Sequence, residues 1–139
     1  MITNPIHVAT ISGHAVRYFK SPLNDGQPDF VWHSVNDLAN AAGLTPEMAE
    51  HFLRTSKQDH PQMYRTIATI DGLETIAPHC VAQGFTRAMA AVGKTSASFV
   101  DDYLMASVEA DAKHPTFSLD DIAEAVHRWD GTLNISRGV

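Results

Sequence analysis

Apolar and polar residues alternate in short runs over the first third of the chain, a spacing that is typical of β-strands. β-Branched and aromatic residues are frequent in these runs, and Gly13 and His14 between the first two suit a tight hairpin loop. Residues 21–28 are rich in turn-forming types and predict an exposed loop. Three strands are therefore expected, over residues 7–12, 15–19 and 30–32.

The spacing becomes helical after Ser34, which can cap a helix N-terminus together with Asp37 three residues later. Gly43 predicts the end of this helix, and Thr45 followed by Pro46 is typical of the start of the next one. The apolar face of the first helix would consist of Val35, Leu38, Ala39 and Ala42. In the second helix we expect Met48, Ala49, Phe52 and Leu53 to face inward and Glu50, His51, Arg54 and Lys57 to face outward.

Further along the chain, Asp71 and Gly72 favour a hairpin turn between two strands, over residues 64–70 and 73–77. Three more helices are expected: residues 79–92, a helix from Ser96 or Ser98 to the residues before Pro115, and a helix from Ser118 to Gly131. The inward face of the first of these helices would consist of Val81, Phe85, Ala88, Met89 and Val92. That of the second would consist of Phe99, Val100, Tyr103, Leu104 and Val108. That of the third would consist of Leu119, Ile122, Ala123, Val126 and Trp129.

These elements predict an α+β fold, with a small antiparallel sheet and about five helices that include a helix-turn-helix-like pair. Residues 1–112 would form one domain. Residues 113–139 would be a C-terminal helix and tail docked on that domain through Ile122, Val126 and Trp129, after a short linker over residues 111–116. The last eight residues are expected to be loose.

The length of 139 residues suits a single domain, and 44% hydrophobic residues is an ordinary composition for a globular protein. No apolar run reaches the roughly 20 residues that a membrane-spanning helix needs, and the N-terminus does not resemble a secretory signal. A single cysteine excludes an internal disulfide. We therefore expect a cytoplasmic protein without a membrane partner.

Catalytic motifs are missing from the sequence. It contains no HExxH, CxxC, GxSxG or complete phosphate-binding glycine loop, and its eight histidines are scattered. Cys80 stands at a predicted helix start next to His79, where a reactive thiolate is conceivable, but a small buried residue explains it more simply. We expect no enzymatic activity, no catalytic residues, no metal and no cofactor.

Charge is distributed unevenly along a chain whose net charge is −6. A protein that coats nucleic acid is usually basic, so DNA binding here would depend on a local patch. The segment from His51 to Arg65 carries three cations against one acid, whereas residues 101–130 carry eight acids against Lys113 and Arg128. The acidic stretch is either a solvated helix surface or a surface for a basic partner.

Residues 35–53 have the layout of a helix-turn-helix. Ala39 is small where two helices would approach, Gly43 permits the positive φ of the turn, and Leu44 can fill the corner. The alternative is an ordinary helical hairpin. In the DNA-binding interpretation, the contacts to phosphates or bases would come from His51, Arg54, Lys57 and Arg65.

The order of these elements resembles the N-terminal domain of the BRO family and related phage antirepressors. Phe30 and Val31 are similar to the strand of that domain, residues 35–42 to its first helix and Gly43 to its closing glycine, with Ser34 in place of the usual acid. The resemblance covers about residues 6–110 and includes two further segments, 69–76 and 96–104.

The resemblance implies a phage- or prophage-type regulatory module that binds double-stranded DNA. The alternative is an antirepressor-like module that binds a repressor or another regulatory protein, and not DNA. In that case the partner-binding residues would be Asp120, Asp121 and Glu124. Small regulators are often symmetric, so a homodimer is also conceivable.

Overall fold

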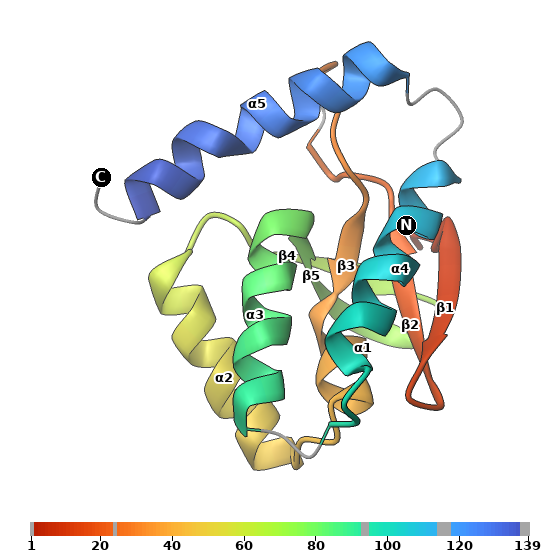
Figure 1. The fold of residues 1–139 in the computed structure, drawn as a ribbon, viewed down its shortest axis with the longest axis vertical. Helices are drawn as coiled ribbons and strands as arrows, with labels where there is room; N and C mark the ends of the chain where they lie inside the picture. The colour runs from red at the N-terminus through yellow and green to blue at the C-terminus, as the bar shows by residue number, and fades with distance from the viewer. Residues whose placement is uncertain (1, 24, 93–94, 114–117, 137–139) are drawn as a thin grey trace.

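The computed structural model describes residues 2–23, 25–92, 95–113 and 118–136, with side chains up to Trp129. It contains one antiparallel five-stranded sheet in the order β1-β2-β3-β5-β4 (Figure 1). Five helices accompany the sheet, so the expected α+β fold is confirmed. The strands are β1 (His7–Ile11), β2 (His14–Phe19), β3 (Trp32–Ser34), β4 (Arg65–Thr69) and β5 (Gly72–Pro78).

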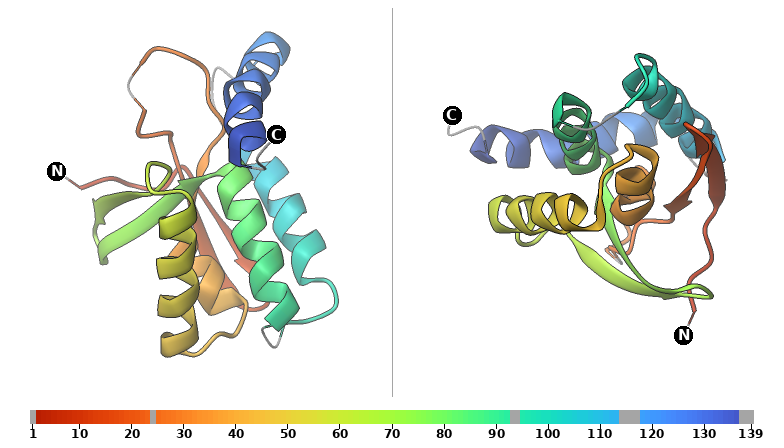
Figure 2. Two further views of the ribbon diagram at one scale, coloured as in Figure 1. Left: turned by 90° about the vertical axis from the view of Figure 1, so that its left-hand side faces the viewer. Right: turned by 90° about the horizontal axis from the view of Figure 1, so that it is seen from below.

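Four of the helices gather on one side of the sheet, and the fifth crosses the end of that group (Figures 1 and 2). Helices α3 and α4 lie side by side, and α1 sits between α3 and the sheet. The helices are α1 (Val35–Ala41), α2 (Pro46–Asp59), α3 (His79–Val92), α4 (Phe99–Ala112) and α5 (Leu119–Ser136).

The main core lies between the sheet and helices α1, α3 and α4, and its largest side chains include Tyr18, Leu38 and Tyr103. A smaller cluster of Phe19, Trp32 and Ile76 lies apart from it, and Trp129 of α5 packs there. Tyr18 and Phe19 are neighbours in β2 and belong to different clusters, because successive side chains of a strand point to opposite faces. This alternation gives the sheet an apolar surface on both sides.

The short strand β3 leaves the sheet at Ser34 and continues directly as α1, which opens a gap between β2 and β5. Side chains in the first turn of α1 fill that gap. Asp37 accepts a hydrogen bond from the backbone N–H of Arg17 in β2 (2.9 Å), and Asn36 accepts one from the N–H of Thr75 in β5 (2.9 Å). Two partly buried backbone donors that have no strand partner at this point are thus satisfied.

The guanidinium of Arg17 occupies the same gap. It donates to both oxygens of Asp37 (2.8 and 2.9 Å) and forms ion pairs with Glu74 (2.7 Å) and Asp71 (3.5 Å). The Arg17 side chain is 14% exposed, and its hydrogen bonds to Asp37 are the largest cause that raises its pKa. These four residues, which we call the Arg17 cluster, join β2, α1 and the β4–β5 hairpin.

A second cluster attaches α5 to the rest of the molecule. The carboxylate of Asp29 accepts hydrogen bonds from Ser21 Oγ (2.5 Å), from Trp32 Nε1 (2.8 Å) and from Trp129 Nε1 (2.8 Å). Arg128 lies 3.7 Å from Asp29 and also pairs with Asp25. The Asp29 cluster comprises Ser21, Asp25, Asp29, Trp32, Arg128 and Trp129.

The predicted attachment of α5 was correct for Trp129 and wrong for Ile122 and Val126. Their exposed fractions are 37% and 47%, whereas Ala125 is fully buried. The hydrogen bond and ion pair that Trp129 and Arg128 make with Asp29 fix which side of α5 faces the rest of the molecule. That side is not the aliphatic side that the sequence predicted to be buried. Helix α5 also continues to Ser136, so Gly131 does not end it.

Other helix faces differ from their prediction near the ends. Val92 is 54% exposed and Val108 is 64% exposed, and Ala88 also lies on the surface. Helix α4 packs through Phe99, Tyr103, Ala106, Ser107 and Ala110 instead, a face that small residues let approach the core closely. The spacing of apolar residues correctly predicted a helix, but the side of α4 that is buried carries small residues, and Val108 lies on the exposed side.

Some element boundaries also need correction. The third strand is Trp32–Ser34 and not residues 30–32, because Trp32 and His33 pair with both neighbouring strands. The first hairpin turns at Ser12 and Gly13, both with positive φ (51° and 81°), so His14 already belongs to β2. Asp111 lies within α4 and accepts a hydrogen bond from the Val31 N–H (3.0 Å), so it is not part of a linker. Residues 114–116 of the predicted linker lie outside the described residues.

Candidate functional site: the outer surface of helix α2 and the groove beside it

The predicted turn between α1 and α2 is present. The N–H of Leu44 bonds to the Ala39 carbonyl (3.3 Å) and the N–H of Gly43 to that of Asn40 (3.1 Å), which is a Schellman motif. Gly43 has a φ of 76°, which glycine adopts without steric strain. Leu44 packs against the core, and Thr45 Oγ1 accepts a hydrogen bond from the Met48 N–H (3.2 Å) to cap α2.

Helix α2 is the least embedded of the helices that cover the sheet. All of its residues are described, and none of its side chains is fully buried. Ala49, Phe52 and Leu53 contact the core while remaining partly exposed, and Met48 lies at the surface, so the inward prediction holds for three of four residues. The helix therefore stands at the edge of the domain with a wide surface open to solvent.

Three of the four predicted DNA-contact residues, His51, Arg54 and Lys57, lie on α2, and the fourth, Arg65, lies on β4. His51 and Arg54 are exposed, and Lys57 is half-buried one turn further on. Arg54 forms an ion pair with Glu50 (3.1 Å), which is also exposed. Arg65 is exposed at the start of β4, where it donates to the carbonyls of Gln62 (2.8 Å) and Tyr64 (3.2 Å).

Arg65 is held close to α2 through its neighbour Tyr64. The hydroxyl of Tyr64 bonds to the hydroxyl of Ser56, so β4 begins beside the last turns of α2. Tyr64 thus fixes the start of β4, where Arg65 lies, next to α2.

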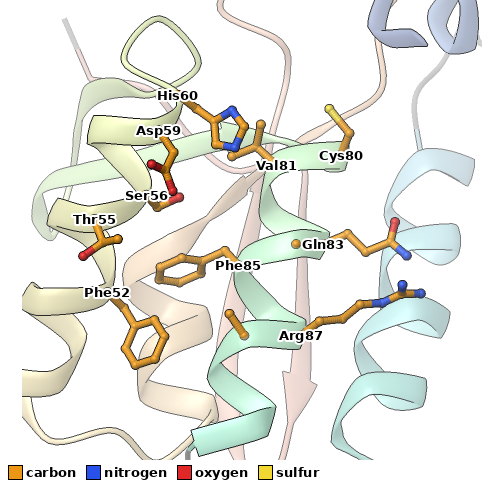
Figure 3. Close-up of a pocket in the computed structure, with 12 residues that line it drawn as sticks. Phe52, Thr55, Ser56, Asp59, His60, Cys80, Val81, Gln83, Phe85 and Arg87 are labelled. Atoms are coloured by element: carbon orange, nitrogen blue, oxygen red, sulfur yellow. The ribbon is translucent and has the colours of Figure 1, made fainter. Parts of the chain in front are cut away.

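A groove runs between α2 and α3, with a volume of about 580 Å³ (Figure 3). Figure 3 shows the rings of Phe52 and Phe85 between the two helices, and Asp59 and His60 at the upper end of α2. Gln83 and Arg87 extend from α3 on the side away from α2. A second hollow of about 310 Å³ lies on the other side of α2, against α1. Helix α2 is therefore flanked by open space on both sides.

Gly84 forms part of the groove and has an unusual place for a glycine. It lies in the middle of α3, and a Cβ atom added to it would meet no other atom within 4 Å. Glycine inside a helix is less stable than alanine by about 0.5–1 kcal/mol. No packing constraint in the described structure requires a glycine at this position.

Cys80 lines the same groove but lacks the character of a nucleophile. It is partly buried, and burial raises the pKa of its thiol to about 11, so the thiol stays protonated near neutral pH. Burial also lowers the pKa of the neighbouring His79. Within the described residues, no group of three or more histidine, cysteine or acidic side chains is placed to hold a metal.

The acidic residues of α5 have two different roles. Asp121 is part of a capping box: its carboxylate accepts from the Ser118 N–H (3.0 Å), and the Ser118 hydroxyl accepts from the Asp121 N–H (3.2 Å). Asp120 and Glu124 are exposed. Asp121 thus stabilises the helix start, while the other two carboxylates are available to a partner.

A buried polar cluster in the core was not predicted. His33 is fully buried in β3 and shares a hydrogen bond of 2.8 Å between its Nδ1 and the Tyr103 hydroxyl. Burial holds the pKa of His33 well below its usual value. Among the described residues, His33 Nε2 and His79 Nδ1 find no hydrogen-bond partner. The only sign of this buried polar cluster in the sequence was His33, a histidine within an otherwise apolar strand.

Comparison of the chain with known protein families, curated proteins and solved structures finds no match. The resemblance to the BRO N-terminal domain therefore stays a prediction. In the part of the chain that the structure describes, no helix combines the length and the apolar character needed to cross a membrane.

Proposed function

We propose that the protein is a regulatory DNA-binding module of the phage or prophage type, with α2 as the helix that meets the DNA. The observation that carries the proposal is the α1–turn–α2 unit: its Schellman motif and N-cap fix the turn, and α2 presents His51 and Arg54 to solvent. A helix that reads DNA must protrude far enough to enter the major groove. Helix α2, with no fully buried side chain, meets that requirement.

The sheet supports this role by holding the helix pair rigidly. The strand before α1 (β3) pairs with the second strand after α2 (β5), and the Arg17 cluster joins α1 to the β4–β5 hairpin. Phosphate contacts would come from Arg54, Lys57 and Arg65, and His51 lies where a base edge or a phosphate can be reached. Local cations are sufficient for such contacts although the whole chain is acidic.

The test is the fluorescence anisotropy of a labelled mixed-sequence duplex over a series of salt concentrations. We expect salt-dependent binding by the natural protein and its loss in the double variant Arg54→Glu/Lys57→Glu. Each lost phosphate contact should reduce the salt slope of log K by about 0.9. The matched control is Lys20→Glu/Lys113→Glu, which changes the net charge equally at two exposed positions outside α2 and should retain binding.

A third variant tests the ion pair on α2. Glu50 competes with DNA phosphate for Arg54, so Glu50→Gln should bind more tightly than the natural protein. Equal loss of binding in the control and in the double variant would contradict a specific role for α2. Absence of binding even at low salt would reject the DNA-binding function and favour the antirepressor-like alternative, in which a protein partner meets Asp120, Asp121 and Glu124.

A further inference from the structure

The two edges of the sheet differ in what covers them. At the β4 edge, the backbone N–H of Thr3 donates to the carbonyl of Ala68 (2.7 Å), so the N-terminal segment covers part of that edge. At the other edge, β1 forms the right-hand margin of the molecule in Figure 1, and among the described residues no strand lies beyond it. The outer N–H and C=O groups of an edge strand are a template for a further strand. In this sheet, β1 is the edge at which such a strand can be added.

Strand β1 also lacks the features that commonly protect an edge strand from pairing. Its sequence is HVATI, which contains no lysine, arginine, acid or proline. Its register with β2 is continuous from His7 to Ile11, so no bulge bends the strand away from a partner. Val8, a residue type that favours strand pairing, is 52% exposed on its outer face. Both the backbone and the side chains of β1 therefore favour pairing with a further strand.

The hairpin determines which backbone groups of β1 point outward. Its two-residue turn at positions 12–13 makes Ile11 and His14 the closing pair, which exchanges both of its backbone hydrogen bonds. Hydrogen-bonded and non-hydrogen-bonded pairs alternate along an antiparallel ladder. The N–H and C=O groups of Val8 and Thr10 therefore point away from β2, toward the outer side of the edge.

An independent contact agrees with this assignment. Arg17 is the partner of Val8 in β2, and its backbone N–H points away from β1 to a carboxylate oxygen of Asp37 (2.9 Å). Both residues of a non-hydrogen-bonded pair direct their backbone groups away from each other. The outward direction of the Val8 groups thus follows from the hairpin turn and from Arg17 separately.

We propose that β1 pairs with β1 of a second copy of this chain, antiparallel and about a two-fold axis at Ala9. The two outward-pointing residues lie one on each side of Ala9, so Val8 of each copy meets Thr10 of the other and exchanges two hydrogen bonds with it. Ala9 meets its own copy in the intervening pair, where the Cα atoms approach to about 4.5 Å and a small side chain fits. The edge is therefore complementary to itself, which is what a closed two-fold dimer requires.

This dimer does not depend on the proposed DNA-binding function. Figure 1 shows α2 on the side of the molecule opposite to β1, so pairing at β1 leaves the outer surface of α2 open. Dimerisation is measured without DNA, and DNA binding is measured with variants of α2. Failure of one proposal consequently leaves the other intact.

The test is analytical ultracentrifugation of the full chain over a concentration series. We expect the natural protein to sediment as a dimer and Thr10→Pro to sediment as a monomer at the same concentration. Proline is tolerated in an edge strand where the missing N–H faces outward, so this variant removes a donor to the second copy and keeps the pairing with β2. The control Thr10→Val retains the N–H and should remain dimeric. Circular dichroism verifies folding, and Val8→Pro replaces Thr10→Pro if the latter unfolds.

A charge exchange distinguishes this pairing from other dimers. Val8→Lys/Thr10→Lys places lysines directly opposite each other across the axis, and Val8→Glu/Thr10→Glu does the same with glutamates, so each variant alone should be monomeric. In their mixture each lysine faces a glutamate, and we expect heterodimers. A contact through another surface predicts no such recovery. The proposal is overturned by a natural protein that stays monomeric, by a dimer that Thr10→Pro leaves unchanged, or by a mixture that stays monomeric.

Discussion

The Arg17 cluster and the Asp29 cluster are both ionic sites with a largely buried central residue, and they are built in opposite ways. In the first, one cation is surrounded by the carboxylates of Asp37, Asp71 and Glu74. In the second, one carboxylate is surrounded by a hydroxyl, two indole N–H groups and Arg128. The first joins strands and a helix that cannot separate without unfolding. The second joins the body to α5, whose removal leaves the sheet and the main core in place. The same kind of interaction therefore supports global stability in one case and local docking in the other.

The largest effect is expected from Arg17→Met. The substitution leaves the Asp37 and Glu74 carboxylates, each less than 15% exposed, close together without their cation. Breaking a buried pair by removing one partner costs about 3–5 kcal/mol. Urea unfolding should show this loss as a lower midpoint of a single transition. The control Arg54→Met removes an exposed pair on α2 and should change stability by less than about 0.5 kcal/mol. Similar losses in both variants would refute the distinction.

The next effect is expected from Asp29→Ala, and it should be local. The indole N–H groups of Trp32 and Trp129 and the guanidinium of Arg128 lose their shared acceptor. Leaving buried donors unsatisfied costs about 1–3 kcal/mol each, which α5 can avoid by separating from the body. We expect rapid proteolysis within α5 while the far-UV circular dichroism of the remaining fold persists. Asp120→Ala, at an exposed carboxylate of the same helix, is the control. Simultaneous loss of the whole fold would show that the two clusters are not separable.

The pH dependence of the free energy of unfolding tests the contribution of the buried histidines His33 and His79, which belong to neither cluster. Burial lowers the pKa of His33 and His79, so below about pH 6.5 the unfolded chain binds protons that the folded chain does not. Stability should therefore fall as pH decreases through this range, by up to about 1.4 kcal/mol per pH unit for each histidine.

Asp111 acts in the opposite direction at lower pH. Burial raises its pKa to about 6, so between about pH 6 and 4 the folded chain holds the extra proton and gains stability as the pH decreases. The variant Asp111→Asn should accordingly lose stability more steeply below pH 6 than the natural protein. The measurement is urea unfolding between about pH 7.5 and 4.5. A stability that stays constant from pH 7.5 to 6 would contradict the buried neutral histidines.

The smallest effect is expected from Trp129→Phe. The ring is retained against Trp32, with which Trp129 makes an edge-on contact, but the hydrogen bond to Asp29 is lost. One such bond to a charged acceptor is worth about 1.5–3 kcal/mol when both groups stay buried, and less when water replaces the donor. Asp29 keeps three other partners, so we expect about 1 kcal/mol. Hydrogen exchange of α5 should be faster in the variant while the sheet is unaffected. Protection lost equally throughout the molecule would contradict local docking.

Local signals in the sequence predicted much of the fold. Ser34, Thr45 and Ser118 were recognised as helix caps, and each accepts the expected backbone hydrogen bond. These signals depend on residues three positions apart, so the chain itself brings the partners together. Gly43 was recognised as the end of α1 because glycine adopts the positive φ of this turn without strain.

The clusters could not be predicted because their partners are distant along the chain. Arg17 meets Asp37 across 20 residues, and Asp29 meets Trp129 across 100. Asp37 was interpreted as part of a cap, and nothing in its local spacing shows that its carboxylate turns to β2 instead. The groove was missed for a related reason, since its walls belong to two helices whose separation is set by the core. Gly84, placed in the middle of an apolar helix, was the one local sign of it.

The Asp29 cluster also allows the docking of α5 to be followed by intrinsic tryptophan fluorescence. The chain contains two tryptophans, and the indole N–H groups of both bind the same carboxylate, one from β3 and one from α5. Intrinsic tryptophan emission therefore reports one site and no other. Any event that lifts α5, whether a partner, a salt or a substitution, should shift that emission without an added label.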